Sequence, residues 1–285
     1  MKRLVKTFVY ALLLLLVTAS CEKSLLDEAA FEQENGDGNL KVSVFEIEKT
    51  VFGNLTRAAL SDVCTRINFI AYTPDGERVA KIDQEAGDPD FGAASFFLDP
   101  GDYQVVVVAH SSNGNPSSTD PSRIRFTNSQ GYSDTFFSSR SVTIGEDEVD
   151  MSVSLDRISS LCRFQITDDY PAGVAKMRFR YTGGSGAFNG NTGLGSVNST
   201  QTLLLDITSG QNQFDLYTYL HDTTGTIHLT VQALDVDDNV MFEREFDVPM
   251  EKNRVTRLSG AYFSGFTTFS VSVSTDWNDE RVINF

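Results

Sequence analysis

The chain shows its fold class most plainly at residues 149–155, which read Val-Asp-Met-Ser-Val-Ser-Leu. Apolar and polar side chains alternate here without exception, and this period of two is typical of a β-strand with one buried face. The same alternation returns at 162–166 and 177–181, and the segment 103–109 contains four consecutive valines. Sustained helical periodicity is missing from Leu40 onward. The pattern therefore predicts an all-β protein.

The expected strands are short and are separated by turn-forming residues. Turn chemistry appears at Pro74 to Gly76, at Asp99 to Asp102 and at Gly145 to Asp147. We expect the first strand at Leu40 to Phe52, and the last ones at 202–207, 213–220, 226–234, 240–248 and 266–275. Short strands at a spacing of about 8 to 12 residues indicate β-sandwiches. The length suits two in series, so we predict domains at 40–156 and 157–285.

Residues 1–20 have the marks of a secretory signal peptide. Basic side chains precede an apolar run from Phe8 to Val17, which is too short for a membrane span of about 20 residues. Small residues then lead directly to Cys21, an arrangement that resembles the lipobox of bacterial lipoproteins. The resemblance implies cleavage before Cys21 and lipidation of its sulfur, with acyl chains such as palmitate holding the protein at the outer membrane. An ordinary signal peptide with a chance cysteine is the alternative.

Residues 21–39 are dominated by acidic side chains and end in Asn35 to Asn39, which are rich in glycine. Low hydrophobicity and like charge oppose folding, so we interpret this segment as a solvated tether. Asp27-Glu28 resembles a surface-export signal of some Bacteroidetes lipoproteins, and a plain linker is the equal alternative.

Charge excludes one class of partner. The chain has 23 Lys+Arg and 39 Asp+Glu, and removing residues 1–20 takes away three basic residues, leaving 20 minus 39, or −19. A protein with this much negative charge repels the phosphates of nucleic acid. We therefore exclude nucleic acid as a partner.

Two cysteines remain once Cys21 is assigned to lipid, namely Cys64 and Cys162. Each falls near an early strand of its own predicted domain. Two buried free thiols are therefore the favoured interpretation, and a disulfide between them is the alternative.

Motifs for catalysis or cofactor binding are weak, so we predict no enzyme, no cofactor and no metal site. His110, His221 and His228 lack metal-ligand spacing and are expected at the surface. The glycine-rich residues 183–196 have no phosphate-binding signature and are expected to form a mobile loop. Asp235 to Asn239 lacks the glycine and the distal glutamate of a calcium loop, so a hairpin turn is favoured.

Several segments, taken in order, resemble the fimbrillin superfamily of Bacteroidales, the lipoprotein subunits of fimbriae. They are the lipobox at Cys21 and the segments Thr65 to Gly76, Leu98 to Ala109, Leu155 to Phe164, Val248 to Gly260 and Asp276-Trp277. The resemblance implies two transthyretin-like β-sandwich domains and assembly into a cell-surface fimbria by β-strand exchange, with adhesion as its outcome. Its partners would be other fimbrial subunits, the outer membrane and a host or bacterial surface receptor.

In shaft members of this superfamily, a protease cuts after a basic residue behind the first strand. Arg57-Ala58, in the loop Gly53 to Ala59, match that position. Cleavage there and an intact, lipid-anchored chain are both open. Residues 266–285 could be donated to a neighbouring subunit, or could form the last strand of their own domain, which we prefer.

A second function class is a surface lipoprotein that captures glycans for a neighbouring transporter. Such sites usually present aromatic platforms, and the single Trp277 argues against this class.

Overall fold

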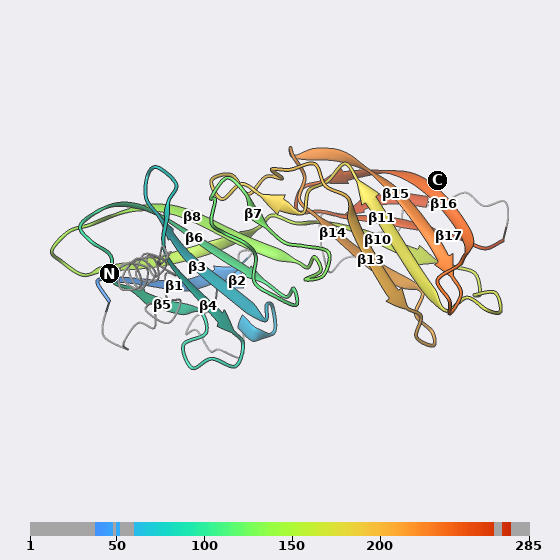
Figure 1. Ribbon diagram of the computed structural model, residues 1–285, viewed down its shortest axis with the longest axis horizontal. Helices are drawn as coiled ribbons and strands as arrows, with labels where there is room; N and C mark the ends of the chain where they lie inside the picture. The colour runs from blue at the N-terminus through green and yellow to red at the C-terminus, as the bar shows by residue number, and fades with distance from the viewer. Residues whose placement is uncertain (1–37, 48–49, 52–59, 265–269, 275–285) are drawn as a thin grey trace, which may run out of the picture. The chain divides into compact units, whose positions relative to one another are not determined.

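The predicted all-β class is confirmed by the computed structural model, which describes residues 38–47, 50–51, 60–264 and 270–274. The strands of the first part of the chain are drawn in Figure 1. They are β1 (Leu40–Ile47), β2 (Thr50–Val51), β3 (Arg66–Tyr72), β4 (Arg78–Glu85), β5 (Ala93–Phe96), β6 (Gly101–His110), β7 (Ile124–Arg125), β8 (Thr135–Ile144) and β9 (Val149–Arg157). Seven of them follow the order β2-β1-β9-β8-β6-β3-β4 in one sheet, and β5 also pairs with β1.

The second part of the chain builds two four-stranded sheets, β14-β10-β17-β18 and β13-β11-β15-β16. Their strands are β10 (Ser160–Ile166), β11 (Lys176–Thr182), β13 (Gln201–Asp206), β14 (Gln213–Thr218), β15 (Thr224–Leu234), β16 (Val240–Glu251), β17 (Val255–Gly260) and β18 (Ser270–Ser274). The short strand β12 (Ala187–Phe188) pairs instead with β7.

One pairing pattern occurs twice along the chain. Strand β1 is antiparallel to β5 and parallel to β9, and β10 is likewise antiparallel to β14 and parallel to β17. Strand β3 lies between β4 and β6, just as β11 lies between β13 and β15. The predicted division near Asp156 into two transthyretin-like domains stays a prediction, because Gly38–Phe285 clusters as one compact unit.

The buried side chains form three clusters. The first draws its buried members from residues 40–155 and the second from residues 162–262. The third cluster combines both parts of the chain, since it contains Tyr72, Val106 and Phe137 together with Phe188 and Tyr219. It therefore packs strands of the first sheet against residues that follow β10.

The glycine-rich residues 183–196 contribute Phe188 to this third cluster and are hydrogen-bonded within it, so the expectation of a mobile loop was wrong. Ser185 and Phe188 are fully buried, and the Phe126 amide donates a 2.9 Å hydrogen bond to the Gly186 carbonyl. Glycine is needed at Gly184, because a Cβ atom there would lie 2.0 Å from the Thr218 hydroxyl. The glycines thus permit close packing rather than mobility.

One strand prediction also needs correction. The first strand does not run from Leu40 to Phe52: β1 ends at Ile47, and β2 folds back so that Thr50 lies opposite Ile47. The strands expected at 213–220 and 226–234 follow one another in the chain but lie in different sheets, because β14 joins β10 whereas β15 joins β11 and β16. The chain crosses between two sheets at this point, which periodicity alone does not reveal.

Candidate assembly site

Strand β1 is an interior strand of its sheet. Its partner β9 runs parallel to it along Leu40–Ile47, and β5 and then β2 occupy its other edge. The inward side chains are Leu40, Val42, Val44 and Ile47, and each is at most 2% exposed. They belong to the first hydrophobic cluster. A seemingly peripheral N-terminal strand is thus part of a core.

Polar contacts fix the register at the start of β1. The Asn39 carboxamide donates to the Leu98 carbonyl at 2.7 Å and accepts from the Leu98 amide at 2.9 Å, so the side chain imitates a backbone pair. The Asn39 carbonyl accepts from the Val149 amide at 2.9 Å. On the outer face, Lys41 and Glu148 form a 2.6 Å ion pair that is partly exposed to solvent, so it adds little stability. The backbone and the buried face therefore hold the strand in place.

Burial of the β1 side chains contributes a large part of the folding free energy for a single strand. Burial of an aliphatic side chain contributes about 1.5–3 kcal/mol, so the four inward side chains of β1 contribute about 6–12 kcal/mol. Whole domains are stable by only about 5–15 kcal/mol. Without β1, an apolar slot would open between unpaired edges of β5 and β9. A chain that loses β1 needs another strand in its place.

The predicted processing residues Arg57 and Ala58, like the predicted lipidation residue Cys21, lie outside the described residues. The chain re-enters the described structure at Leu60, which is fully buried in the first cluster. The Cys64 amide donates to the Leu60 carbonyl at 2.9 Å. If the chain were cut before Ala58, the buried Leu60 would therefore still hold it in the first core, two residues after the new N-terminus.

At the other end of the chain, β18 pairs antiparallel with β17, from Ser274 opposite Val255 to Ser270 opposite Ser259. Val271 packs against the second cluster, whereas Val273 is 37% exposed. The segment before β18 is held by a carboxylate. Asp168 accepts from the backbone amides of Tyr262 at 2.7 Å and of Phe263 and Ser264 at 2.8 Å.

The charge of Asp168 is favoured by these contacts. Partial burial raises the pKa of Asp168, but the three backbone hydrogen bonds together outweigh burial and lower the pKa below its usual value. In this structure β18 is the last strand of its own sheet. Donation of residues 266–285 to a neighbouring subunit stays an open prediction.

Cys64 and Cys162 are buried free thiols. Cys64 belongs to the first cluster and Cys162 to the second, and no bond joins them. Burial raises the pKa of each thiol to about 12, so neither is a reactive thiolate at neutral pH.

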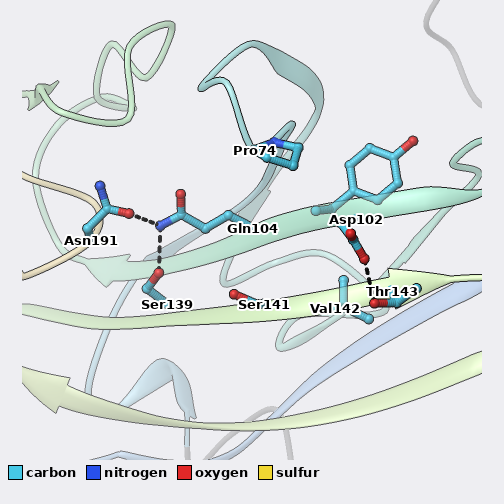
Figure 2. A pocket seen from close by; sticks show the side chains of 9 residues that line it. Pro74, Asp102, Gln104, Ser139, Ser141, Val142, Thr143 and Asn191 are labelled. Carbon is cyan, nitrogen blue, oxygen red and sulfur yellow. Dashed lines mark hydrogen bonds between the residues drawn. The ribbon is translucent and has the colours of Figure 1, made fainter.

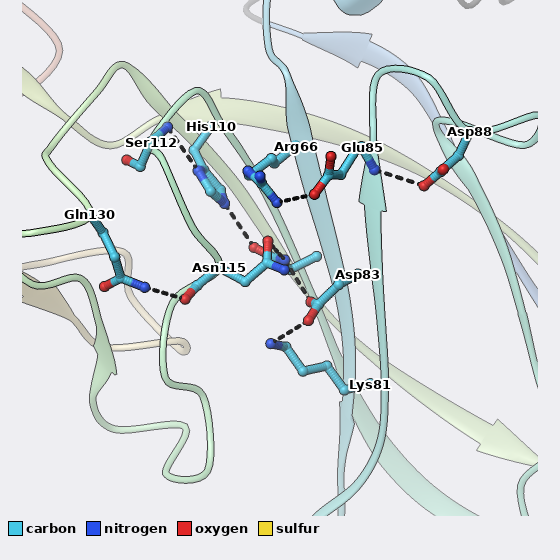
Figure 3. A network of polar contacts seen from close by, with 10 residues as sticks. Arg66, Lys81, Asp83, Glu85, Asp88, His110, Ser112, Asn115 and Gln130 are labelled. Carbon is cyan, nitrogen blue, oxygen red and sulfur yellow. Dashed lines mark hydrogen bonds and ion pairs between the residues drawn. The ribbon is translucent and has the colours of Figure 1, made fainter. Parts of the chain in front are cut away.

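Of the three histidines, His110 is fully buried, so its expected surface position was wrong. Its Nε2 lies 3.0 Å from Asn68 Oδ1, and its Nδ1 accepts from the Ser112 amide at 3.2 Å. Figure 3 shows the continuing network, in which Asn68 donates to Asp83 at 2.6 Å and to Asn115 at 3.0 Å. The network ties the segment after β6 to β3 and β4. Sequence periodicity carries no signal for such a network.

The other two histidines contact different partners. His221 Nδ1 is 2.9 Å from the Gly195 carbonyl, and His228 Nδ1 is 2.6 Å from Asp247 on β16. Both side chains are exposed, as expected.

The expected turn at Asp235 to Asn239 is confirmed. It joins β15 to β16, and the Asp235 carboxylate accepts from the amides of Asp237 and Asn239 at 2.9 Å. No group of three or more His, Cys, Asp or Glu side chains within the described ranges is arranged to hold a metal ion. The described part of the chain also contains no helix with the length and apolar character needed to cross a bilayer.

Comparison with known families finds one match. The model of a family of unknown function, DUF6562, covers residues 34–284. No curated protein matches the chain.

Three solved structures with a similar fold illustrate the likeness. A candidate adhesin from Bacteroides ovatus is 16% identical, with a TM-score of 0.48 over 73% of this chain and 82% of that chain. The fimbrial anchor protein Mfa2 from Porphyromonas gingivalis is 10% identical, with a TM-score of 0.46 over 83% of this chain and 96% of that chain. The tip fimbrial protein Mfa3 from the same organism is 12% identical, with a TM-score of 0.41 over 84% and 99%.

Proposed function

Because the chain belongs to the DUF6562 family, whose function is unknown, we propose its function from its own strands. It is a structural subunit of a cell-surface fimbria, exported as an outer-membrane lipoprotein and assembled by β-strand exchange. Adhesion is the outcome of assembly, and the partners are other subunits of the fimbria. The protein has no catalytic role in this proposal.

One observation carries the proposal, namely the position of β1. Its four inward side chains fill a slot between β5 and β9, and the strand is followed by the segment that contains Arg57. A cut in that segment would separate β1 from the rest of its domain. The vacated slot presents two unpaired edges and an apolar floor, which is the arrangement that binds an added strand.

Cleavage also decides the role of the lipid. A cut after Arg57 would release residues 21–57, and with them the lipid on Cys21, so the processed chain would be a unit of the polymer. An uncut chain would keep Cys21 and would anchor the fimbria in the outer membrane.

The test is the N-terminus of the protein recovered from the cell surface, read by Edman sequencing and intact mass. A start at Ala58 supports a processed subunit, and a lipid-blocked Cys21 supports an anchor. A start at any other residue overturns the assignment of Arg57. The variant Arg57→Ala should give no surface protein that begins at Ala58. The control Arg140→Ala, at an exposed position of β8, should leave the cleavage unchanged.

Assembly is tested separately on gels of surface extracts. Strand exchange is supported by ladders of multimers that resist heating and that disappear when β1 is prevented from leaving its slot. Monomer alone, in a strain that assembles its fimbriae normally, contradicts it. Monomer with glycan uptake would instead favour the alternative function, glycan capture for a neighbouring transporter, which stays a prediction.

A further inference from the structure

A groove of about 590 Å³ is lined by residues of β6 and β8 (Figure 2). Its residues Asp102 and Gln104 share the face of β6 with Val106 and Val108 of the third cluster, whereas Val105 and Val107 face the first cluster, to which β1 belongs. The volume of the groove is within the range of about 300–1,000 Å³ that is usual for small-molecule sites. The residues that line it are Pro74, Asp102, Tyr103, Gln104, Ser139, Ser141, Val142, Thr143 and Asn191.

The groove begins where the third hydrophobic cluster ends. Along β6, the outward side chains change from the buried Val108 and Val106 to Gln104 and then Asp102. Along β8, which is paired with β6, the outward Phe137 gives way to serines and a threonine. The sheet face therefore turns from apolar to polar at this point, and the walls of the groove come from loops.

The polar groups of the groove are held in fixed orientations. Gln104 Nε2 shares its two hydrogens among three acceptors, namely Ser139 Oγ at 2.8 Å, Asn191 Oδ1 at 2.5 Å and the Gly190 carbonyl at 3.1 Å. Figure 2 shows the Gln104 oxygen directed away from these partners. Thr143 Oγ1 donates to Asp102 Oδ1 at 2.6 Å, which leaves Asp102 Oδ2 as a second acceptor. Two hydrogen-bond acceptors are thus preorganised, which reduces the entropic cost of binding.

The chemistry of the lining selects one class of ligand. None of the lining residues carries a positive charge, so the groove does not suit an anion, and one carboxylate is too few for a metal ion. Asp102 and Gln104 present acceptors, while the Ser141 hydroxyl and the Asn191 amide present donors. The ring of Pro74 adds apolar surface. A sugar complements this lining, because its hydroxyl groups both donate and accept hydrogen bonds and its ring presents an apolar C–H face.

We propose that this groove binds a neutral saccharide. The sugar hydroxyls donate to Asp102 and to the Gln104 oxygen, and accept from Ser141 and Asn191, while an apolar ring face packs against Pro74. The site goes beyond the proposed assembly function, since none of its lining residues belongs to β1. A negative result for saccharide binding would therefore not bear on strand exchange, and a negative result for strand exchange would not bear on saccharide binding.

Saturation-transfer NMR of the full chain, kept in a sugar-free zwitterionic detergent, tests the proposal. The probes are the methyl glycosides of glucose, galactose, mannose and N-acetylglucosamine. We expect saturable transfer to at least one of them. Asp102→Ala should weaken its binding at least about tenfold, because a hydrogen bond to a charged group is lost. Ser141→Tyr should abolish binding by filling the groove.

The matched control is Asp150→Ala, which removes an exposed carboxylate from β9, outside the groove. It should bind like the unmodified chain, and all three variants should unfold at similar temperatures. Absence of saturation transfer to all four glycosides would overturn the proposal. Binding that survives both Asp102→Ala and Ser141→Tyr would overturn it as well.

Discussion

At the scale of single residues, the buried His110 has a strongly lowered pKa. Burial, together with the positive charges of Arg66 and Lys81, lowers the pKa of His110 to about 3 from its ordinary 6.5. The ring is therefore neutral in the folded protein at physiological pH. Its Nε2 can donate to Asn68 while its Nδ1 accepts from Ser112, an arrangement that only the neutral ring permits.

This residue makes stability depend on pH. The folded-state pKa lies below the unfolded one, so the unfolded chain binds the extra proton between about pH 6.5 and 3. The contribution of His110 is complete above that window and is lost as pH falls through it. Between pH 7 and 4.5 we expect a loss of about 2.5 kcal/mol from this residue. Urea unfolding at several pH values should show a flatter profile for His110→Gln, and an equally steep profile would contradict the assignment.

Asp168 is the second residue that carries a specific prediction. An asparagine at this position keeps one acceptor oxygen but replaces the other with a donor, which opposes the amides of Phe263 and Ser264. Asp168→Asn should therefore lower the free energy of unfolding by about 1–3 kcal/mol. Chemical denaturation measures the change, and Asp169→Asn, at the exposed neighbouring position, is the control. Equal effects of the two substitutions would show that the three hydrogen bonds are unimportant.

At the scale of elements, β1 determines whether the first core is complete. Its alternation places Val44 inward, whereas Lys41 lies on the outer face. Val44→Ser puts a hydroxyl and a cavity into the first cluster and should cost about 2–4 kcal/mol. Lys41→Ser breaks a partly exposed ion pair and leaves the buried face of β1 intact, so it should cost less than about 1 kcal/mol. Denaturant titration of both variants tests the difference, and similar costs would mean that β1 is not part of the core.

The elements that sequence analysis missed share a physical cause. Strand β4 reads Arg-Val-Ala-Lys-Ile-Asp-Gln-Glu and is mostly half-buried or exposed, so its apolar signal is weak. It becomes a strand because β3 offers it a complete edge from Arg66 to Tyr72. Strand β5 is short, and its pairing with β1 depends on residues about fifty positions away in sequence. Tertiary pairing decides such strands more than local propensity does.

At the scale of the whole molecule, the third hydrophobic cluster couples the two parts of the chain. Phe188 lies 5.8 Å from Phe137 and 5.1 Å from Tyr219 between ring centroids. The Thr135 and Tyr219 hydroxyls are 3.0 Å apart within the same region. Aromatic packing and a buried hydrogen bond thus connect residues on both sides of Asp156.

Removal of one ring should weaken this coupling. Phe188→Ala leaves a cavity in the cluster and should destabilise the protein by about 3–5 kcal/mol. We expect calorimetry to resolve two unfolding transitions in this variant, because the parts of the chain then unfold with less cooperation. Phe97→Ala, at a position that is 58% exposed, should cost far less and keep the unmodified profile. A Phe188→Ala profile that matches the Phe97→Ala profile would refute the coupling.

The sequence by itself determined the β class, most of the strongly alternating strands and the turns at Gly76, Gly101 and Asp235 to Asn239. These features depend on local periodicity and turn chemistry, which a single chain displays directly. Tertiary structure alone decided that β14 and β15 join different sheets, that residues 183–196 are buried, and that His110 is neutral in a polar network. It also decided that Gln104 and Asn191, 87 positions apart in sequence, meet in one groove. Such features arise from contacts between distant residues, and the free energy of those contacts does not appear in any local pattern.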